Sequence, residues 1–221
     1  MSVSGSDMML ALSDIDVDIQ STPILRGLSM EVGAGQLVSL VGRNGAGKTT
    51  TMRTIMGMTR PRGGSIRFDG ETITDMAAYR RPALGIGYMP EDRRLVPQLT
   101  VEENMLLPAW VNATIDQQAG LTFIYDLMPE LDDMKDRKAL LRAGGQQKLA
   151  ALGRALMAGS RLLLLDEPFE GVAPALANRL SEVIGTLRGS QRSILIAQSE
   201  LSHAHAVADR EYVIERGAIV D

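Results

Sequence analysis

The stretch Gly42-Arg43-Asn44-Gly45-Ala46-Gly47-Lys48-Thr49 decides the fold, because it matches the pattern G-x-x-x-x-G-K-[ST] of a phosphate-binding loop. Glycines let the backbone curl so that several N–H groups point at phosphate oxygens. A helix that follows such a loop adds the positive end of its dipole. Residues 36–41 are typical of a buried strand and residues 49–57 of a helix, so the loop stands in the required order. A chance glycine-rich turn is the alternative, and this order argues against it.

The loop predicts a division of roles among its residues. Lys48 can reach the β- and γ-phosphates of a nucleotide, and the Thr49 hydroxyl can ligate Mg²⁺. The residues assigned to nucleotide binding in this loop are Asn44, Gly45, Gly47, Lys48, Thr49 and Thr50.

Composition excludes several classes of protein. The 221 residues suit one or two domains, and a hydrophobic content of 45% allows a sizeable core. The net charge of −4 gives no sign of a nucleic-acid-binding surface. The chain has no cysteine, which excludes disulfides, thiolate catalysis and zinc–thiolate sites.

Nothing in the sequence predicts a membrane span. Residues 1–7 lack a basic region followed by an apolar run, so no secretory signal is expected. All apolar runs are much shorter than the ~20 residues that cross a bilayer. If the protein works at a membrane, another chain must provide the spanning segments.

Strand-like and helix-like segments alternate along the chain, which predicts a largely parallel α/β core. Short β-like segments are expected within residues 8–41. Further strands are expected at 65–68, 86–89, 161–165 and 193–197, with a closing hairpin at 211–220. Helices are expected at 174–187 and 202–208, and a mostly helical region at 98–157. The helical middle predicts an inserted subdomain.

A second acidic motif completes the predicted nucleotide site. The apolar strand 162–165 runs into Asp166 and Glu167, at the strand end where open α/β sheets bind ligands. Asp166 can hold the Mg²⁺ water shell, and Glu167 can polarise an attacking water. The guanine-reading pattern N-K-x-D does not occur, which favours ATP.

Four motifs follow one another along the chain, namely the phosphate loop at 42–49, Tyr88-Met89-Pro90-Glu91, Gly144-Gly145-Gln146-Gln147 and Asp166-Glu167-Pro168. Their order resembles that of the nucleotide-binding subunit of an ATP-binding-cassette (ABC) transporter over essentially the whole chain, in which the last three stand at the Q-loop, the signature and Walker B. Strings at 90–104, 152–157 and 166–174 narrow the resemblance. They are similar to one of the two ATPase subunits of branched-chain amino-acid importers.

The resemblance implies a fold and a domain organisation. The fold is α/β, a P-loop NTPase core of the ABC ATPase type, with an N-terminal antiparallel β-subdomain and an inserted α-helical signature subdomain. Residues 1–221 would form a single ABC ATPase domain. Its catalytic core and β-subdomain would comprise 1–90 and 158–221, and the Q-loop and helical subdomain about 91–157.

The resemblance also implies an activity and partners. The chain would hydrolyse Mg²⁺-ATP and power uptake of amino acids or related small polar organic solutes. Its partners would be transmembrane permease subunits, a second ABC ATPase subunit in a homo- or heterodimer, and indirectly an extracytoplasmic solute-binding protein, with no nucleic acid. The location would be peripheral, at the cytoplasmic face of the cell (inner) membrane. Alternatives are a non-transport ABC ATPase and a weakly hydrolysing regulatory subunit.

Two departures from the ABC pattern concern the nucleotide contacts. Ile19 stands where an aromatic residue usually stacks on adenine, a contact worth ~1–3 kcal/mol. Ile19 can supply only apolar contact, unless it is a simple strand residue and a neighbour covers the base. The signature, which contacts the partner's ATP, has Ala143 in place of serine before Gly144, Gly145 and Gln146. Loss of that hydroxyl weakens the facing site by ~1.5–3 kcal/mol, unless backbone N–H groups suffice.

Two further departures are shared with the importer subunit that the chain resembles. Glu91 replaces the Q-loop glutamine, and its carboxylate can ligate Mg²⁺. Gln198 replaces the switch histidine, and its amide can donate to a γ-phosphate oxygen but cannot carry a proton. The assigned catalytic residues are therefore Glu167 and Gln198, and the metal ligands are Thr49, Glu91 and Asp166. Together with Ala143, the departures suggest an asymmetric pair with one stronger and one weaker ATP site.

One basic pair is left with two interpretations. Arg93 and Arg94 follow the Q-loop, which in the resembled family lies near the transmembrane partner. They form either a solvated face or part of that interface.

Overall fold

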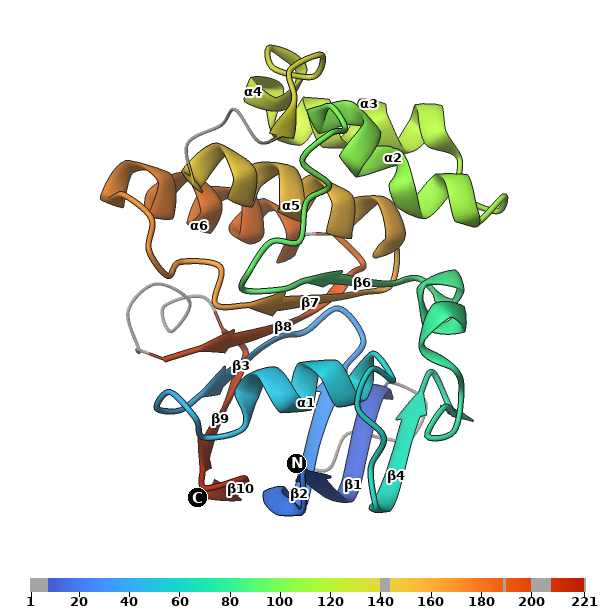
Figure 1. Cartoon of the computed structure of the whole chain (residues 1–221), viewed down its shortest axis with the longest axis vertical. Helices are drawn as coiled ribbons and strands as arrows, with labels where there is room; N and C mark the ends of the chain where they lie inside the picture. The colour runs from blue at the N-terminus through green and yellow to red at the C-terminus, as the bar shows by residue number, and fades with distance from the viewer. Residues whose placement is uncertain (1–7, 140–143, 189, 200–207, 221) are drawn as a thin grey trace.

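The computed structural model describes residues 8–139, 144–188, 190–199 and 208–220 (Figure 1). The strands are β1 (Met8–Ile19), β2 (Thr22–Gly33), β3 (Leu37–Val41), β4 (Gly63–Phe68), β5 (Glu71–Thr72), β6 (Ile86–Met89), β7 (Leu162–Asp166), β8 (Ser193–Gln198), β9 (Arg210–Glu215) and β10 (Ala218–Val220). The helices are α1 (Lys48–Ile55), a 3₁₀ helix η1 (Ala78–Leu84), α2 (Val101–Val111), α3 (Gln117–Leu127), α4 (Pro129–Asp132), α5 (Gly144–Ala158) and α6 (Pro174–Arg188).

A six-stranded sheet in the order β10-β9-β3-β8-β7-β6 forms the centre of the molecule. Strand β3 pairs in parallel with β8 and β9, and β7 pairs in parallel with β6 and β8. Every side chain of β3, β7 and β8 is buried, as expected for parallel strands covered on both faces. The predicted parallel α/β core is confirmed, and the carboxyl ends of β3, β7 and β8 meet at one edge.

The N-terminal β-region is more regular than the sequence predicts. Instead of several short segments, β1 and β2 are two strands of 12 residues each, paired in antiparallel fashion. Gln20 and Ser21 connect them with φ values of 49° and 65°, as in a tight two-residue hairpin turn. Pro23 is tolerated because β2 is an edge strand of the sheet β2-β1-β4-β5.

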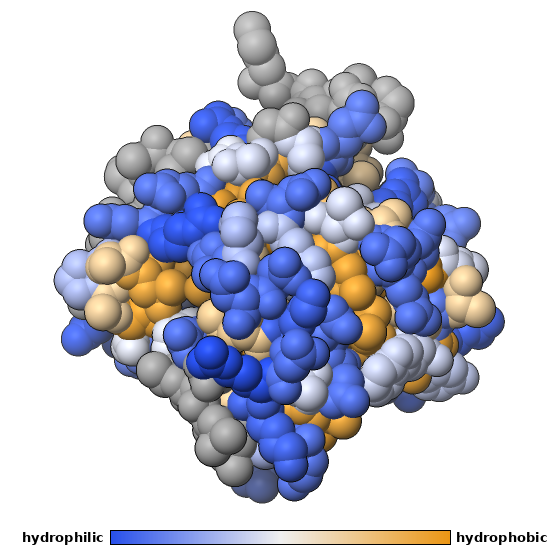
Figure 2. All heavy atoms as spheres, turned by 90° about the horizontal axis from the view of Figure 1, so that it is seen from above, coloured by the Kyte–Doolittle hydropathy of each residue, from blue (hydrophilic) through white to orange (hydrophobic). Residues whose placement is uncertain are grey.

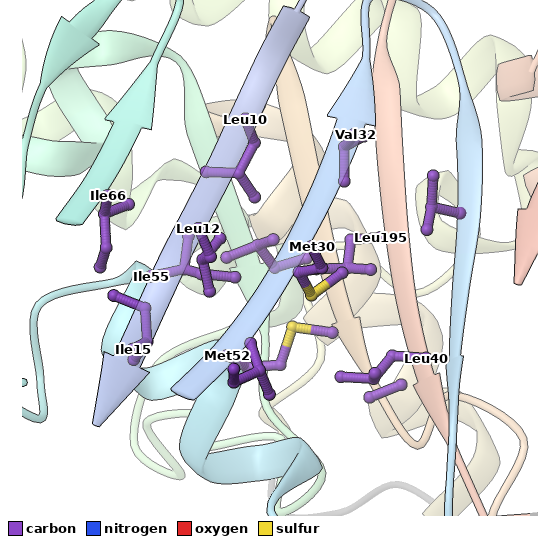
Figure 3. Close-up of a cluster of buried hydrophobic side chains, with 14 of the residues drawn as sticks. Leu10, Leu12, Ile15, Met30, Val32, Leu40, Met52, Ile55, Ile66 and Leu195 are labelled. Carbon is purple, nitrogen blue, oxygen red and sulfur yellow. The ribbon is translucent and has the colours of Figure 1, made fainter. Parts of the chain in front are cut away.

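Helix α1 lies between the two sheets (Figure 1). Figure 3 shows apolar side chains that fill this layer, among them Met52 and Ile55 of α1, Leu12 of β1 and Leu40 of β3. These four side chains have at most 2% of their surface exposed. The phosphate loop is thereby fixed between a rigid strand and a helix packed on both sides.

The helical region covers the opposite face of the central sheet. Helices α5 and α6 lie directly on the sheet, and α2, α3 and α4 lie beyond them (Figure 1). The outer face above these helices is mostly hydrophilic with separate hydrophobic patches (Figure 2). Helix α2 begins with a capping box between Thr100 and Glu103. The helix predicted at 202–208 falls almost entirely outside the described residues.

None of the helices in the described part of the chain combines the length and the apolar character needed to cross a bilayer.

Candidate functional site

The phosphate loop connects β3 to α1 through glycines in left-handed conformations. Gly45 has a φ of 82°, and Gly47, which caps α1, has a φ of 118°. A Cβ atom on Gly47 would lie 2.8 Å from Cδ2 of Leu25, so a larger residue would need both strained backbone and repacking. Helix α1 has neither an acidic residue in its first turn nor a side-chain cap. Its N-terminal N–H groups are therefore left to an anion.

The Lys48 side chain folds back over this loop. Its Nζ donates to the carbonyl oxygens of Gly42 at 2.6 Å and Arg43 at 3.3 Å. Nζ also lies 3.1 Å from Oε1 of Glu167, and the Lys48 side chain is only 5% exposed. The structure thus joins the predicted phosphate-binding lysine to the predicted hydrolytic carboxylate across 119 sequence positions (167 − 48).

Asp166 ends β7 beside the first turn of α1. Its Oδ1 accepts a hydrogen bond from the Thr49 hydroxyl at 3.3 Å, and its Oδ2 accepts one from the Tyr88 hydroxyl at 3.3 Å. The pKa of Asp166 is raised to about 6, chiefly by burial and also by the nearby Glu91 and Glu167 carboxylates, while the two hydrogen bonds oppose the shift. A nearby cation would stabilise the ionised form of this buried carboxyl, so the position of Asp166 next to Thr49 fits a magnesium site.

Glu167 follows in a left-handed conformation with a φ of 49°, uncommon for a residue with a side chain. Its amide N–H donates to the Ala197 carbonyl at 2.9 Å. Its carboxylate accepts a hydrogen bond from the Ser199 backbone N–H at 3.1 Å and from the Ser199 hydroxyl at 2.5 Å. Glu167 is 6% exposed. The carboxylate is therefore oriented by Ser199, just after β8, as well as by Lys48.

Ser199 is a site residue that the sequence analysis missed. Its Oγ contacts Lys48 Nζ at 3.1 Å and Asn44 Oδ1 at 2.6 Å, besides Glu167. A hydroxyl has one hydrogen to donate, so the Asn44 contact fits best with the amide nitrogen of Asn44 as donor. The sequence feature that could have identified Ser199 is its position directly after Gln198, at the carboxyl end of β8, where the site residues of β3 and β7 also meet.

Gln198 occupies a different environment from the one expected of it. Its side chain is buried, and Nε2 donates to the Ser39 hydroxyl at 3.2 Å. Only its backbone carbonyl touches the phosphate loop, through a hydrogen bond from Gly42 N–H at 3.2 Å. To reach a phosphate, the Gln198 amide would have to leave Ser39.

Most of the residues predicted to bind nucleotide line one cavity of about 400 Å³, together with Glu91 and Glu167. Its lining residues are Ile24, Asn44, Gly45, Gly47, Lys48, Thr49, Thr50, Glu91 and Glu167. The cavity has a cationic side chain, a helix N-terminus and loop amides for a triphosphate, which fits ATP. Within the described residues no group of three His, Cys, Asp or Glu side chains forms a metal cage. Mg²⁺ commonly uses one or two carboxylates plus substrate phosphates, and Thr49, Asp166 and Glu91 fit that pattern.

Ile19 and the signature lie apart from this cavity. Ile19, at the end of β1, is 43% exposed and does not line the cavity, whereas Ile24 of β2 does. Ala143 lies outside the described residues. Gly144, Gly145 and Gln146 begin α5, and no residue of α5 lines the cavity in the part of the chain that is described. A Cβ on Gly145 would lie 2.5 Å from Cδ2 of Leu176, so this helix start packs closely on α6.

Comparison with known proteins places this site in a family. The model of the ABC transporter family matches residues 25–170. The high-affinity branched-chain amino acid transport ATP-binding protein BraG of Pseudomonas aeruginosa is 35% identical, over 96% of this chain and 91% of BraG. The lipopolysaccharide export system ATP-binding protein LptB of Haemophilus influenzae is 29% identical, over 96% of this chain and 89% of LptB.

Solved structures agree with the sequence comparisons. A nucleotide-free ATP-binding cassette from an ABC transporter superposes with a TM-score of 0.84 at 26% identity, over 97% of this chain and 90% of the other. A dimeric bacterial ABC transporter cassette superposes with a TM-score of 0.85 at 19% identity, over 96% and 97% of the two chains, which shows the shared fold. This chain therefore belongs to the ABC transporter family, in which it is an ATP-binding subunit that hydrolyses ATP.

Proposed function

We propose that this chain powers an importer of amino acids or related small polar organic solutes. The observation that carries its ATPase role is the meeting of Lys48, Thr49, Glu91 and Glu167 around one cavity, with Asp166 bonded to Thr49 at its edge. The similarity to BraG supports the importer assignment.

The phosphate loop would bind and orient the triphosphate. Backbone N–H groups of the loop and of the α1 N-terminus would donate to phosphate oxygens, with Asn44 and Thr50 beside them. Lys48 would exchange its contact with the Glu167 carboxylate for the β- and γ-phosphates. Ile24 and Ile19 would give apolar contact to the base. Phosphoryl transfer requires little covalent chemistry from the protein, so this positioning supplies much of the catalysis.

Three residues would hold Mg²⁺, namely Thr49, Asp166 and Glu91. The ion neutralises charge that develops on the phosphates during transfer. Glu167 would accept a proton from the attacking water as general base. Ser199 would keep the Glu167 carboxylate oriented through its hydroxyl and its backbone N–H. Gln198 would approach the γ-phosphate only after releasing Ser39.

A second ABC ATPase subunit would complete each site. The start of α5, with Ala143, Gly144, Gly145 and Gln146, would face the ATP of the partner, because it lines no part of this chain's own cavity among the described residues. The proposed single domain then has a core in 1–90 and 158–221 and a signature-bearing region in about 91–157. The Ala143 signature would make the site facing it the weaker one. Ala143→Ser should raise turnover of the assembled complex, and unchanged turnover would refute this asymmetry.

A groove beside the Q-loop is the proposed docking site of the permease. Its volume is about 630 Å³, and apolar side chains such as Met56, Leu107 and Val111 line it. Arg53 and Arg94 stand among them, so the groove suits an apolar segment with acidic or carbonyl groups at its ends. A transmembrane permease offers such a segment at the cytoplasmic face of the membrane, which would place this chain there as a peripheral subunit. An extracytoplasmic solute-binding protein would act on the far side.

The direction of transport is the part of the proposal that most needs a test. LptB, which is 29% identical, belongs to an export system for lipopolysaccharide. Cells expressing the chain with its permease should accumulate labelled branched-chain amino acids, and Glu167→Gln should abolish this uptake. Lys135→Met, a change at a partly exposed lysine that does not line the cavity, is the matched control. Unchanged amino-acid uptake together with a defect in lipopolysaccharide at the cell surface would refute the importer assignment. If Glu167→Gln changed neither amino-acid uptake nor lipopolysaccharide at the cell surface, a non-transport or regulatory ABC protein would be favoured.

A further inference from the structure

Lys148 is a buried lysine of α5 that the proposed mechanism does not use. It is 4% exposed and lies on the first turns of the helix that begins with the signature glycines. Its Nζ donates to the backbone carbonyls of Glu167 at 2.7 Å, Pro168 at 3.2 Å and Glu170 at 2.5 Å. An ammonium group has three hydrogens, so these three carbonyls engage all of its donors. Burying a charge is costly, and a complete set of acceptors at one turn offsets that cost.

The turn held by Lys148 is the one that presents the Glu167 carboxylate. Glu167 has the left-handed φ of 49°, and the Glu170 N–H closes the turn by donating to the Glu167 carbonyl at 3.2 Å. One of the three carbonyl oxygens that Lys148 binds therefore belongs to Glu167, the residue whose side chain contacts Lys48. Strained backbone of this kind persists where its surroundings hold it in place.

The first turn of α5, at the other end of the connection made by Lys148, is held in place as well. Arg93, which follows the Q-loop, donates from Nη1 to the Gly144 carbonyl at 3.1 Å and to Oε1 of Gln147 at 3.0 Å. Gly145 packs closely against Leu176. The first turn of α5 is thus held by Arg93 on one side and joined to the Glu167 turn by Lys148 on the other.

We propose that Lys148 is a positioning residue that ties the Glu167 turn to the signature end of α5, so that the carboxylate at one ATP site follows the signature that serves the other. This inference rests on the proposed role of Glu167 and deepens it. Lys148 does not line the nucleotide cavity, so its effect would fall on turnover rather than on ATP binding.

The test uses the 221-residue chain with Lys148→Met, which keeps a long side chain but removes all three donors. Lys148→Gln, which retains two donors, should lie between Lys148→Met and the wild type. Lys135→Met is the control, because the Lys135 side chain is 41% exposed and contacts Asp132 and the Tyr125 ring rather than the Glu167 turn. Amide hydrogen exchange of residues 167–171, ATP affinity and phosphate release are measured for each variant.

We expect Lys148→Met to speed exchange at 167–171, to leave exchange in α2 and ATP affinity unchanged, and to lower kcat about 10- to 100-fold. Unchanged exchange at 167–171 would refute the connection itself. Faster exchange with an unchanged kcat would refute its positioning role. Glu167→Gln is run in parallel, because full turnover in that variant would overturn the proposed function while leaving the exchange result valid.

Coupling to the signature end is tested by a double-mutant cycle. Arg93→Met and Lys148→Met act on one connected path, so their combined effect on kcat should be smaller than the product of the single effects. Independent, multiplicative losses would refute the coupling.

Discussion

The ammonium nitrogen of Lys48 lies 3.1 Å from the Oε1 atom of Glu167, and the two side chains are only 5% and 8% exposed. The group proposed to bind phosphate and the group proposed to activate water therefore neutralise each other in the nucleotide-free protein. A triphosphate that recruits Lys48 releases Glu167 from this pair at the same time. Nucleotide binding thereby frees the carboxylate for its proposed role as general base.

Removing one partner of this pair should destabilise the nucleotide-free chain. Lys48→Met leaves the Glu167 carboxylate buried without its cation, which should cost about 3 kcal/mol of unfolding free energy. Lys48→Met/Glu167→Gln should regain most of that loss, because no unpaired charge remains. Urea unfolding without nucleotide measures both. A double variant no more stable than Lys48→Met would show that the ion pair is not what holds the two side chains.

Asp166 gives the stability a specific dependence on pH. Its pKa is raised from 3.8 to about 6 in the folded chain. Between these two pH values the folded state therefore holds a proton that the unfolded state has lost. The stabilising effect of that proton is complete below the unfolded pKa and is lost as the pH rises through about 6. Asp166→Asn stays neutral at every pH. Its unfolding free energy relative to the wild type should therefore increase by about 2 kcal/mol between about pH 4 and pH 7.5.

Urea unfolding of both proteins across this pH range, without metal or nucleotide, checks the effect. Taking the difference between variant and wild type removes the contributions of other titrating groups. A difference that does not change with pH would mean that Asp166 is ionised in the folded chain at all these values.

Ser199 and Gln198 are neighbours with separable roles. Ser199→Ala removes the hydroxyl contact to the Glu167 carboxylate, and loss of a hydrogen bond to a charged group should lower kcat about tenfold or more. Gln198→Ala leaves the Ser39 hydroxyl unpaired, so it should lower the unfolding free energy by about 1 kcal/mol. Phosphate release and urea unfolding are compared for both. A larger loss of kcat in Gln198→Ala would return the main phosphate-sensing role to Gln198.

The groove beside the Q-loop predicts a surface variant that separates ATP binding from docking. Val111 is 86% exposed at the groove, and Val111→Asp would place a charge in an apolar contact. Binding to the permease should weaken about tenfold or more, while ATP affinity of the isolated chain stays the same. Val220→Asp changes an exposed valine of β10 outside the groove and is the control. Equal permease binding by both variants would refute the docking site.

Much of the fold follows from local sequence patterns. The buried run 162–165 and the glycine-rich loop at 42–49 predicted a strand and a strand–loop–helix unit, and both are present as β7 and β3–α1. Residues 8–33 were less predictable. Their two 12-residue strands depend on pairing with each other and with β4, which no local pattern encodes.

Only some residues of the candidate site could be predicted from the sequence. The positions of Lys48, Thr49 and Asp166 could be predicted because strand ends and motif spacing fix their backbone positions. The direction of the Gln198 side chain, the presence of Ser199 beside Glu167 and the donors of Lys148 could not, because each depends on a contact with a residue distant in the sequence. The two arginines that follow the Q-loop have different surroundings, which the sequence did not predict. Arg93 binds the start of α5, while Arg94 lines the groove.

The central claim is that Glu167 drives hydrolysis of ATP held by the phosphate loop. It is tested most directly by measuring ATP binding and phosphate release for the wild type, Glu167→Gln and Lys48→Ala. The account predicts that Glu167→Gln binds Mg²⁺-ATP as tightly as the wild type but releases phosphate more slowly, by a factor of about 100 or more. Lys48→Ala should fail to bind Mg²⁺-ATP. Wild-type phosphate release by Glu167→Gln would contradict it.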